Sequence, residues 1–166
     1  MRQSKLIIKT FAWTIVVLIC VCIAYIVYFL LPSNDLNTRC SELYLHYSDS
    51  DSTSVLSQIE SNDNFLILYF HPECMYCHGN LNSLAKIDMP DLVVDLVSFA
   101  PKDSVDALIQ RLDFSHFDEV NVIYDTTLVW NNKLGIKTIP TTIFFKNGQL
   151  KNKRSGYFKL DQILYE

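Results

Sequence analysis

A long apolar segment near the N-terminus limits how this chain can fold. From Thr10 to Ser33 no side chain is charged, and most residues are Ile, Val, Leu, Phe or Tyr. About 20 consecutive apolar residues are enough for an α-helix to cross the hydrocarbon core of a bilayer. Because helices in soluble cores are rarely apolar on every side, we predict one N-terminal transmembrane helix, an anchor at residues 10–32.

The flanking residues predict how this anchor is oriented and that it is retained. The apolar segment is longer than the roughly 7–15 residues of a signal peptide, and the best small-residue cleavage sequence, ending at Ala24, lies inside it. Arg2, Lys5 and Lys9 precede it, and basic residues favour the cytoplasmic side. We therefore expect a cytoplasmic tail at residues 1–9.

This orientation predicts a single-pass protein of the cytoplasmic or inner membrane. The larger part of the chain would be periplasmic or otherwise extracytoplasmic, where disulfides persist. All 18 acidic residues lie beyond position 33. An acidic domain without a basic cluster binds nucleic acid poorly, so we predict no nucleic-acid partner.

Alternating apolar and amphipathic segments predict an α/β domain after the anchor. Residues 33–51 are polar and rich in turn-forming residues, which indicates a linker, and the domain is placed at residues 52–166. The predicted strands are 65–70, 92–99, 120–125, 141–145 and 149–155; the predicted helices are 52–60, 74–87, 102–112 (capped by Asp103), 127–136 and 158–165. Asn147-Gly148 is a strong hairpin signal. This order of elements predicts a layered α/β architecture.

The sequence "HPECMYCHGN" carries the most informative chemistry. Cys74 and Cys77 are spaced C-x-x-C at the start of a predicted helix that follows an apolar strand. Free N–H groups and the helix dipole favour a thiolate at that place. Cys77, three residues further on, lies on the same face within disulfide reach. Cys74 could therefore attack a disulfide and Cys77 could resolve the product.

Other chemistries use the same spacing. "CMYCH" also satisfies the attachment pattern of a c-type haem, with His78 as the proximal ligand and Met89 as the candidate distal ligand. Zinc requires four ligands, but the chain has no second C-x-x-C; the remaining candidates would be Cys40, His46, His71, His78 and His116. A purely structural disulfide closing so short a loop would stabilise little.

Over about residues 52–166 the sequence resembles the thioredoxin superfamily. The residues that carry the resemblance are the strand "FLILYF", the motif "CMYC" at a helix start, and "TIPTTIFFKNG" about 60 residues later. The predicted anchor and the segment "IPTTIFFKNGQL" resemble those of membrane-anchored envelope thiol–disulfide oxidoreductases. The resemblance implies a three-layer thioredoxin-like fold with a central mixed sheet. It also implies a cis peptide at Ile139–Pro140, near the two sulfurs.

The resemblance also implies site residues. Cys74 and Cys77 would form the redox-active disulfide, and Pro140, Ile139 and Tyr76 would contact the substrate. His78 could modulate the pair. Leu68 and Asn80 occupy positions where relatives carry an acidic residue, so the usual proton acceptor for Cys77 is missing and the direction of electron flow is left open.

Asp95 is the one acidic residue within an inner predicted strand. It is therefore the candidate to modulate Cys77 by accepting its proton, provided that its side chain faces the motif.

These observations predict a thiol–disulfide oxidoreductase that acts on protein cysteines outside the cytoplasm. Its partners would be protein thiols and disulfides and a membrane or soluble redox partner. It would need no metal and no cofactor beyond the Cys74–Cys77 couple. The alternative is a non-catalytic, membrane-anchored binding module on the same fold; a haem protein is a minor alternative. The roles of Cys20, Cys22 and Cys40 stay open, and Cys40, in the predicted linker, could form an intermolecular bridge.

The anchor prediction has a direct test. A reporter enzyme fused after Glu166 should be active only outside the cytoplasm, because the basic tail orients the span. The mature chain should keep its N-terminal segment. A soluble product beginning near residue 25 or 35, or a reporter active inside the cell, would contradict the anchor.

Overall fold

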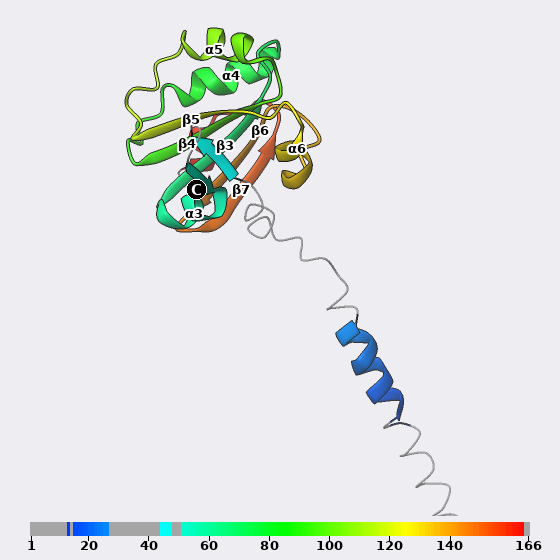
Figure 1. Ribbon diagram of the computed structural model, residues 1–166. Coiled ribbons are helices and arrows are strands. Elements are labelled where there is room, and N and C mark those ends of the chain that lie inside the picture. The colour runs from blue at the N-terminus through cyan, green and yellow to red at the C-terminus, as the bar shows by residue number, and fades with distance from the viewer. Residues whose placement is uncertain (1–12, 14, 27–43, 48–50, 165–166) are drawn as a thin grey trace, which may run out of the picture. The chain divides into compact units, whose positions relative to one another are not determined.

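The computed structural model describes residues 13, 15–26, 44–47 and 51–164 (Figure 1). The chain divides into two units, residues 1–34 and 35–166. In the first unit, residues 15–26 are helical. No helix among the described residues is both long enough and apolar enough to cross a membrane. The rest of the predicted anchor, together with the predicted tail, lies outside the described residues: 1–9, 10–12, 14 and 27–32.

The second unit is built on a five-stranded mixed sheet with the order β5-β4-β3-β6-β7. Its central strand β3 (Asn64–Phe70) pairs in parallel with β4 (Leu92–Ser98) and antiparallel with β6 (Thr141–Lys146). The edge strands are β5 (Glu119–Tyr124), parallel to β4, and β7 (Gln149–Ser155), antiparallel to β6. The predicted strands and the mixed sheet are confirmed.

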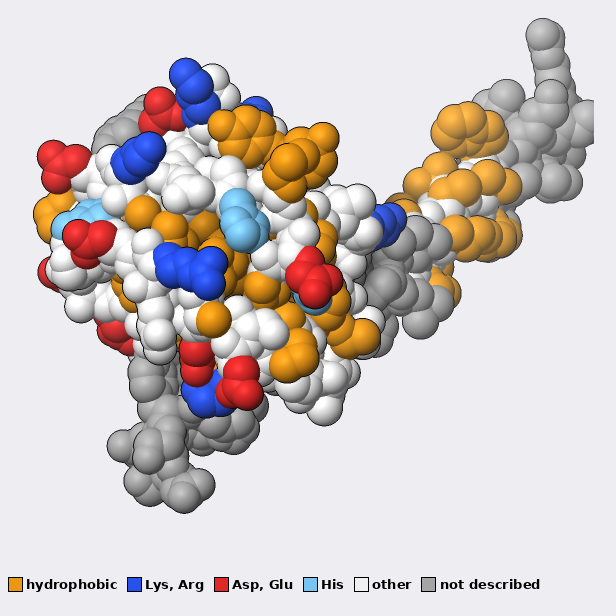
Figure 2. Space-filling model, turned by 90° about the horizontal axis from the view of Figure 1, so that it is seen from above, with side chains coloured by type: hydrophobic (Ala, Val, Ile, Leu, Met, Phe, Trp, Pro, Cys, Tyr) orange, Lys and Arg blue, Asp and Glu red, His pale blue; other side chains and the backbone are white. Residues whose placement is uncertain are grey.

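Helices cover both faces of this sheet and make three layers (Figure 1). One face carries α4 (Met75–Leu84), α5 (Lys102–Ile109) and the short α7 (Asp161–Leu164). The other carries α3 (Val55–Ser61) and α6 (Val129–Leu134). Seen from above in Figure 2, apolar side chains reach the surface among scattered charges of both signs.

The alternation of side chains along β3 explains why its sequence is continuously apolar. Successive residues of a strand point to opposite faces. Leu66, Leu68 and Phe70 belong to the cluster beneath α4 and α5, whereas Phe65 and Ile67 belong to the cluster beneath α3 and α6. We call these the α4 cluster and the α6 cluster. Every residue of β3 is buried, which confirms the predicted central strand.

The structure differs from the sequence prediction before α3. Strands β1 (Tyr44–Tyr47) and β2 (Asp51–Ser54) pair antiparallel, and the helix begins only at Val55. The predicted helix start at residue 52 was therefore wrong. Residues 44–47 lie within the predicted linker 33–51. Both strands are only four residues long and β2 is wholly polar, so the sequence shows no apolar alternation by which to predict the pair.

Of two local predictions, the helix cap at Asp103 was wrong and the turn at Asn147-Gly148 is confirmed. Pro101, not Asp103, is the N-cap of α5, and Asp103 lies in its first turn. A carboxylate there still interacts favourably with the helix N-terminus. At the predicted hairpin, Asn147 and Gly148 both have positive φ, of 51° and 73°. This is the geometry of the two-residue turn that their sequence indicates.

A buried carboxylate fixes α6 at the same end of the sheet as the end of β3. Asp125 accepts hydrogen bonds from the Tyr69 hydroxyl (2.9 Å) and from the backbone N–H groups of Trp130 (3.1 Å) and Asn131 (3.0 Å). Helix α6 ends at Gly135, whose φ is 60°, as predicted. The carboxyl ends of β3, β4 and β5 and the beginning of β6 therefore meet along one edge of the sheet.

Candidate functional site

Cys74 lies between the end of β3 and the start of α4. It is the N-cap residue of α4, with extended backbone angles (φ −87°, ψ 112°), and its Sγ accepts a hydrogen bond from the Cys77 N–H at 3.3 Å. An acceptor at this position satisfies one of the free N–H groups of the first turn. Cys74 thus occupies the helix start that the sequence predicted, at a place where negative charge is favoured.

Cys77 has a different environment from Cys74. It is fully buried in the α4 cluster, whereas Cys74 is half-buried at the edge of that cluster. Both are free thiols in the structure. Burial, followed by the hydrogen bond with Cys74, raises the pKa of the Cys77 thiol to about 12. One thiol is therefore accessible and the other is kept protonated in an apolar core.

Two histidines hold the turn before Cys74. The Cys74 N–H donates to the His71 carbonyl at 3.0 Å, and the Glu73 N–H donates to His71 Nδ1 at 3.2 Å. His78 Nε2 donates to the Pro72 carbonyl. His78, predicted to modulate the pair, therefore contacts the turn that carries Cys74.

The residues between the cysteines are exposed. Met75 is 76% exposed and Tyr76 is 59% exposed. A hollow of about 380 Å³ beside them is lined by Pro72, Glu73, Met75 and His78. A large apolar residue left this open next to a reactive group suits contact with another molecule.

The Ile139–Pro140 peptide is cis, which confirms the expectation from the resemblance. Pro140 is buried and Ile139 is half-buried, packed against both apolar clusters. Strand β6 begins at the next residue, Thr141, which pairs with Tyr69 near the end of β3. The cis peptide therefore lies at the same edge of the sheet as the cysteines.

Asp95 does not face the motif. On β4, Val94 and Leu96 belong to the α4 cluster with Cys77, whereas Val93 and Val97 belong to the α6 cluster. Because side chains alternate along a strand, Asp95 points to the α6 side. The structure therefore argues against the predicted role of Asp95 as a proton acceptor for Cys77.

Asp95 is nevertheless fully buried in an unusual setting. Its Oδ1 accepts a hydrogen bond from Asn121 Nδ2 at 3.0 Å, and its Oδ2 has no hydrogen-bond partner among the described residues. Burial raises the pKa of Asp95 to about 7, the hydrogen bond from Asn121 opposes the rise, and the charge of Glu119 adds to it.

The positions expected to carry an acid are both occupied by neutral residues around Cys77. Leu68 lies in the α4 cluster with Cys77. Asn80 is fully buried, and its side chain bonds to the Gly156 carbonyl and the Phe158 N–H. Sequence reasoning missed Gly156. A glycine after a strand signals a special backbone conformation, but its contacts depend on the fold.

Metal ligands do not gather in the part of the chain that the structure describes, where no three His, Cys, Asp or Glu side chains form a candidate metal site. Cys40 lies outside the described residues.

Comparisons with known proteins identify the fold. Neither protein-family profiles nor curated protein sequences match the chain. Solved structures do match, at low sequence identity. The domain is similar to DsbF of Mycobacterium tuberculosis, solved in mixed oxidised and reduced forms, with a TM-score of 0.62 and 13% identity over 76% of this chain and 93% of that chain.

Two further structures agree. An exposed lipoprotein thioredoxin of Streptococcus pneumoniae has a TM-score of 0.55 and 20% identity over 74% of this chain and 95% of that chain. A secreted M. tuberculosis disulfide oxidoreductase, described as homologous to E. coli DsbE, has a TM-score of 0.59 and 11% identity over 75% and 92%. The domain therefore has a thioredoxin-like fold.

Asp95 should make stability depend on pH without affecting thiol chemistry. Asp95 keeps its proton in the native state up to its raised pKa of about 7, whereas the ordinary pKa of an Asp side chain is 3.8. Between these values the native state binds more protons, so the free energy of unfolding should fall as pH rises, by up to about 1.4 kcal/mol per pH unit. Asp95→Asn should flatten this slope in urea denaturation between pH 4.5 and 7.5.

Asp118→Asn provides a matched control, because it makes the same substitution at an exposed position. It should leave the slope unchanged. The rate of disulfide reduction should be the same in wild type and Asp95→Asn. A slower rate in Asp95→Asn would mean that Asp95 does act on Cys77.

Proposed function

We propose that this protein carries out thiol–disulfide exchange with protein cysteines outside the cytoplasm, using Cys74 and Cys77. One observation carries the proposal. Cys74 is a half-buried N-cap thiol that accepts the Cys77 N–H, and Cys77 is a fully buried thiol one turn later. This pairing of an accessible nucleophile with a shielded second thiol is what a two-step exchange requires.

The exchange proceeds in two balanced steps. The Cys74 thiolate attacks one sulfur of a substrate disulfide, which forms a mixed disulfide and releases the other substrate sulfur as a thiolate that takes up a proton. Cys77 then loses its proton and attacks Cys74 Sγ. The Cys74–Cys77 disulfide forms, the second substrate thiolate leaves, and two electrons have passed to the substrate. Run in reverse, the same steps oxidise a substrate dithiol.

Substrate contacts are assigned to the residues around Cys74. The exposed Tyr76 would pack against the substrate chain. Gly156 N–H already bonds the Pro140 carbonyl at 2.8 Å. We therefore assign the pairing with an extended substrate segment to the Ile139 backbone, with the Pro140 ring as its support.

The location remains part of the proposal. An uncleaved anchor at residues 10–32 would hold the domain at the outer side of the cytoplasmic membrane, as the basic tail predicts. Two proteins with similar structures, one secreted and one an exposed lipoprotein, support the proposal of an extracytoplasmic site of action. A membrane or soluble redox partner would reduce or oxidise the Cys74–Cys77 couple again after each exchange.

The alternatives fit less well. A c-type haem would have to bond the sulfurs of both cysteines, but Cys77 is fully buried in the α4 cluster. A non-catalytic binding module would not require one thiol at a helix start and the other beneath it. Reactivity distinguishes this module from the enzyme, because the cysteines of a module need not cycle.

Trapping experiments test the two thiol roles. Cys77→Ser should accumulate mixed disulfides with other proteins, because nothing resolves the bond to Cys74. Cys74→Ser should accumulate none, because Cys77 is buried. Non-reducing gels of membranes from cells expressing each variant would measure this. Equal trapping by both variants, or by neither, would contradict the assigned order.

The pKa of Cys77 predicts a steep pH dependence. Below a pKa of about 12 the thiolate fraction rises about tenfold per pH unit. If resolution by Cys77 limits turnover, single-turnover reduction of a peptide disulfide should speed up about tenfold from pH 7 to 8 and again to 9. Alkylation of Cys74 in Cys77→Ser provides the control for the first step. A rate already flat above about pH 6.5 would show that another group accepts the proton.

A further inference from the structure

Helix α4 and the loop containing Pro140 are connected through one buried amide. We propose that Asn80 is a positioning residue for thiol–disulfide exchange, which holds the helix that carries Cys77 in register with the Ile139–Pro140 peptide by way of Gly156. The inference rests on the proposed function, because it concerns how substrate is presented to Cys74.

The Asn80 side chain joins α4 to a distant segment through two hydrogen bonds. It lies on α4 three residues after Cys77 and is fully buried. Its Nδ2 donates to the Gly156 carbonyl at 3.3 Å, and its Oδ1 accepts from the Phe158 N–H at 3.4 Å. Both partners are more than 70 residues away in sequence, so the contacts join α4 to the segment after β7.

Gly156 completes the connection. Its carbonyl accepts from Asn80, and its N–H donates to the Pro140 carbonyl at 2.8 Å. One residue is thus bonded to the cysteine helix on one side and to the cis-proline loop on the other. Its φ is 91°, a backbone conformation that residues with a Cβ rarely adopt. Glycine therefore permits both bonds at once.

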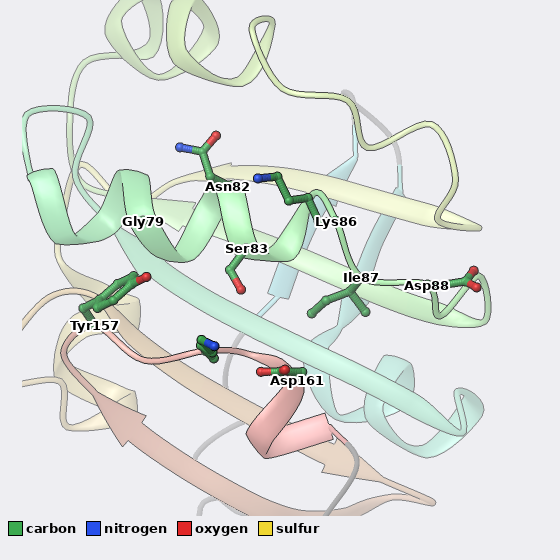
Figure 3. Close-up of a pocket in the computed structure, with 9 residues that line it drawn as sticks. Gly79, Asn82, Ser83, Lys86, Ile87, Asp88, Tyr157 and Asp161 are labelled. Atoms are coloured by element: carbon green, nitrogen blue, oxygen red, sulfur yellow. The ribbon is translucent and has the colours of Figure 1, made fainter.

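Neighbouring contacts hold the same segment against α4. Figure 3 shows the Tyr157 ring against the helix at Gly79, where a Cβ would come within 2.5 Å of the ring. Ser83, which points toward the C-terminal segment in the same view, accepts the Leu160 N–H at 3.4 Å. Of these contacts between described residues, however, only the bond from Asn80 to Gly156 reaches a residue that is also bonded to Pro140.

The chemistry of the side chain explains why this position is an amide. A carboxamide both donates and accepts, so it satisfies a carbonyl and an N–H together. An ionised carboxylate can only accept, and an apolar side chain would remove the partner of both backbone groups, which belong to half-buried residues. Asn80 therefore matches its two partners, which distinguishes it from a residue that merely fills space.

Positioning of this kind should affect large substrates most. A displacement of about 1 Å between a bound substrate and the reacting atom can cost about 100-fold in rate. A peptide held at Ile139 depends on where that loop stands relative to α4. A small alkylating reagent needs only access to Cys74. Loss of the two Asn80 hydrogen bonds should therefore slow the reaction with the peptide and leave the alkylation of Cys74 nearly unchanged.

Asn80→Leu removes both bonds with little change in size, and Ser83→Ala is its matched control, because it removes another bond between α4 and the same segment. The full chain in detergent, reduced beforehand, is assayed with a synthetic peptide disulfide and with iodoacetamide. Asn80→Leu should lower kcat/KM for the peptide by about tenfold or more, chiefly through KM. Its alkylation rate at Cys74 should stay within about twofold of wild type. Ser83→Ala should leave both reactions within about twofold.

Substitutions of two glycines provide a second, independent pair of test and control variants. Gly156→Ala meets no atom within 4 Å but places a Cβ at positive φ. Gly148→Ala also places a Cβ at positive φ, in the β6–β7 turn away from the cysteines, where the nearest backbone atoms lie at an ordinary contact distance of 4.0 Å. Both should lose stability to a similar extent. Only Gly156→Ala should weaken peptide reduction. Equal effects of the two substitutions on kcat/KM would overturn the positioning role.

Amide hydrogen exchange separates this inference from the proposed function. In Asn80→Leu the Gly156 N–H should exchange at least about tenfold faster, while amides of the buried strand β4 keep their wild-type rates. Unchanged exchange at Gly156 would overturn the connection whatever the activity. If wild type does not reduce the peptide at all, the proposed function fails; if wild type is active and Asn80→Leu matches it for the peptide, only the positioning role fails.

Discussion

Burial of the central strand β3 on both faces is the constraint on which the rest of the domain depends. Each of its residues is buried, with alternate side chains in the α4 cluster and the α6 cluster. Such a strand must be covered by helices on both sides, so the chain has to leave its end through a short turn into α4. The turn exposes Cys74, and the first helical turn then carries Cys77 back into the core. The two environments of the cysteines therefore follow from the layering of the fold.

The polar groups at this edge of the sheet serve to hold backbone in place. His71 and His78 fix the turn before Cys74, and Asp125 fixes the start of α6. Asn80 joins α4 to the segment after β7. Each of these side chains forms hydrogen bonds with backbone groups. Backbone groups need such partners once folding removes them from water. A rigid edge results, on which a half-buried thiol is presented at a fixed place.

Neutral residues occupy the two positions near Cys77 at which the thioredoxin resemblance implied an acid. Leu68 contributes an apolar side chain to the surroundings of Cys77, and the amide of Asn80 is occupied by two backbone groups. The one buried acid on β4, Asp95, lies on the other side of the sheet. Its raised pKa bears on the stability of the fold and not on the thiols, because the sheet itself separates the two.

Local patterns in the sequence determined the five strands of the mixed sheet, the helix start at Cys74, the Asn147-Gly148 turn and the α/β class, since each depends on neighbouring residues. The cis peptide at Pro140 came from the resemblance. The face on which Asp95 lies was open, because a strand buried on both sides has no polar alternation to show its orientation. The pairing of β1 with β2 and the bonds from Gly156 to Asn80 and Pro140 were also unpredictable from the sequence. They join segments distant in the chain, and only the packed sheet brings them within hydrogen-bond distance.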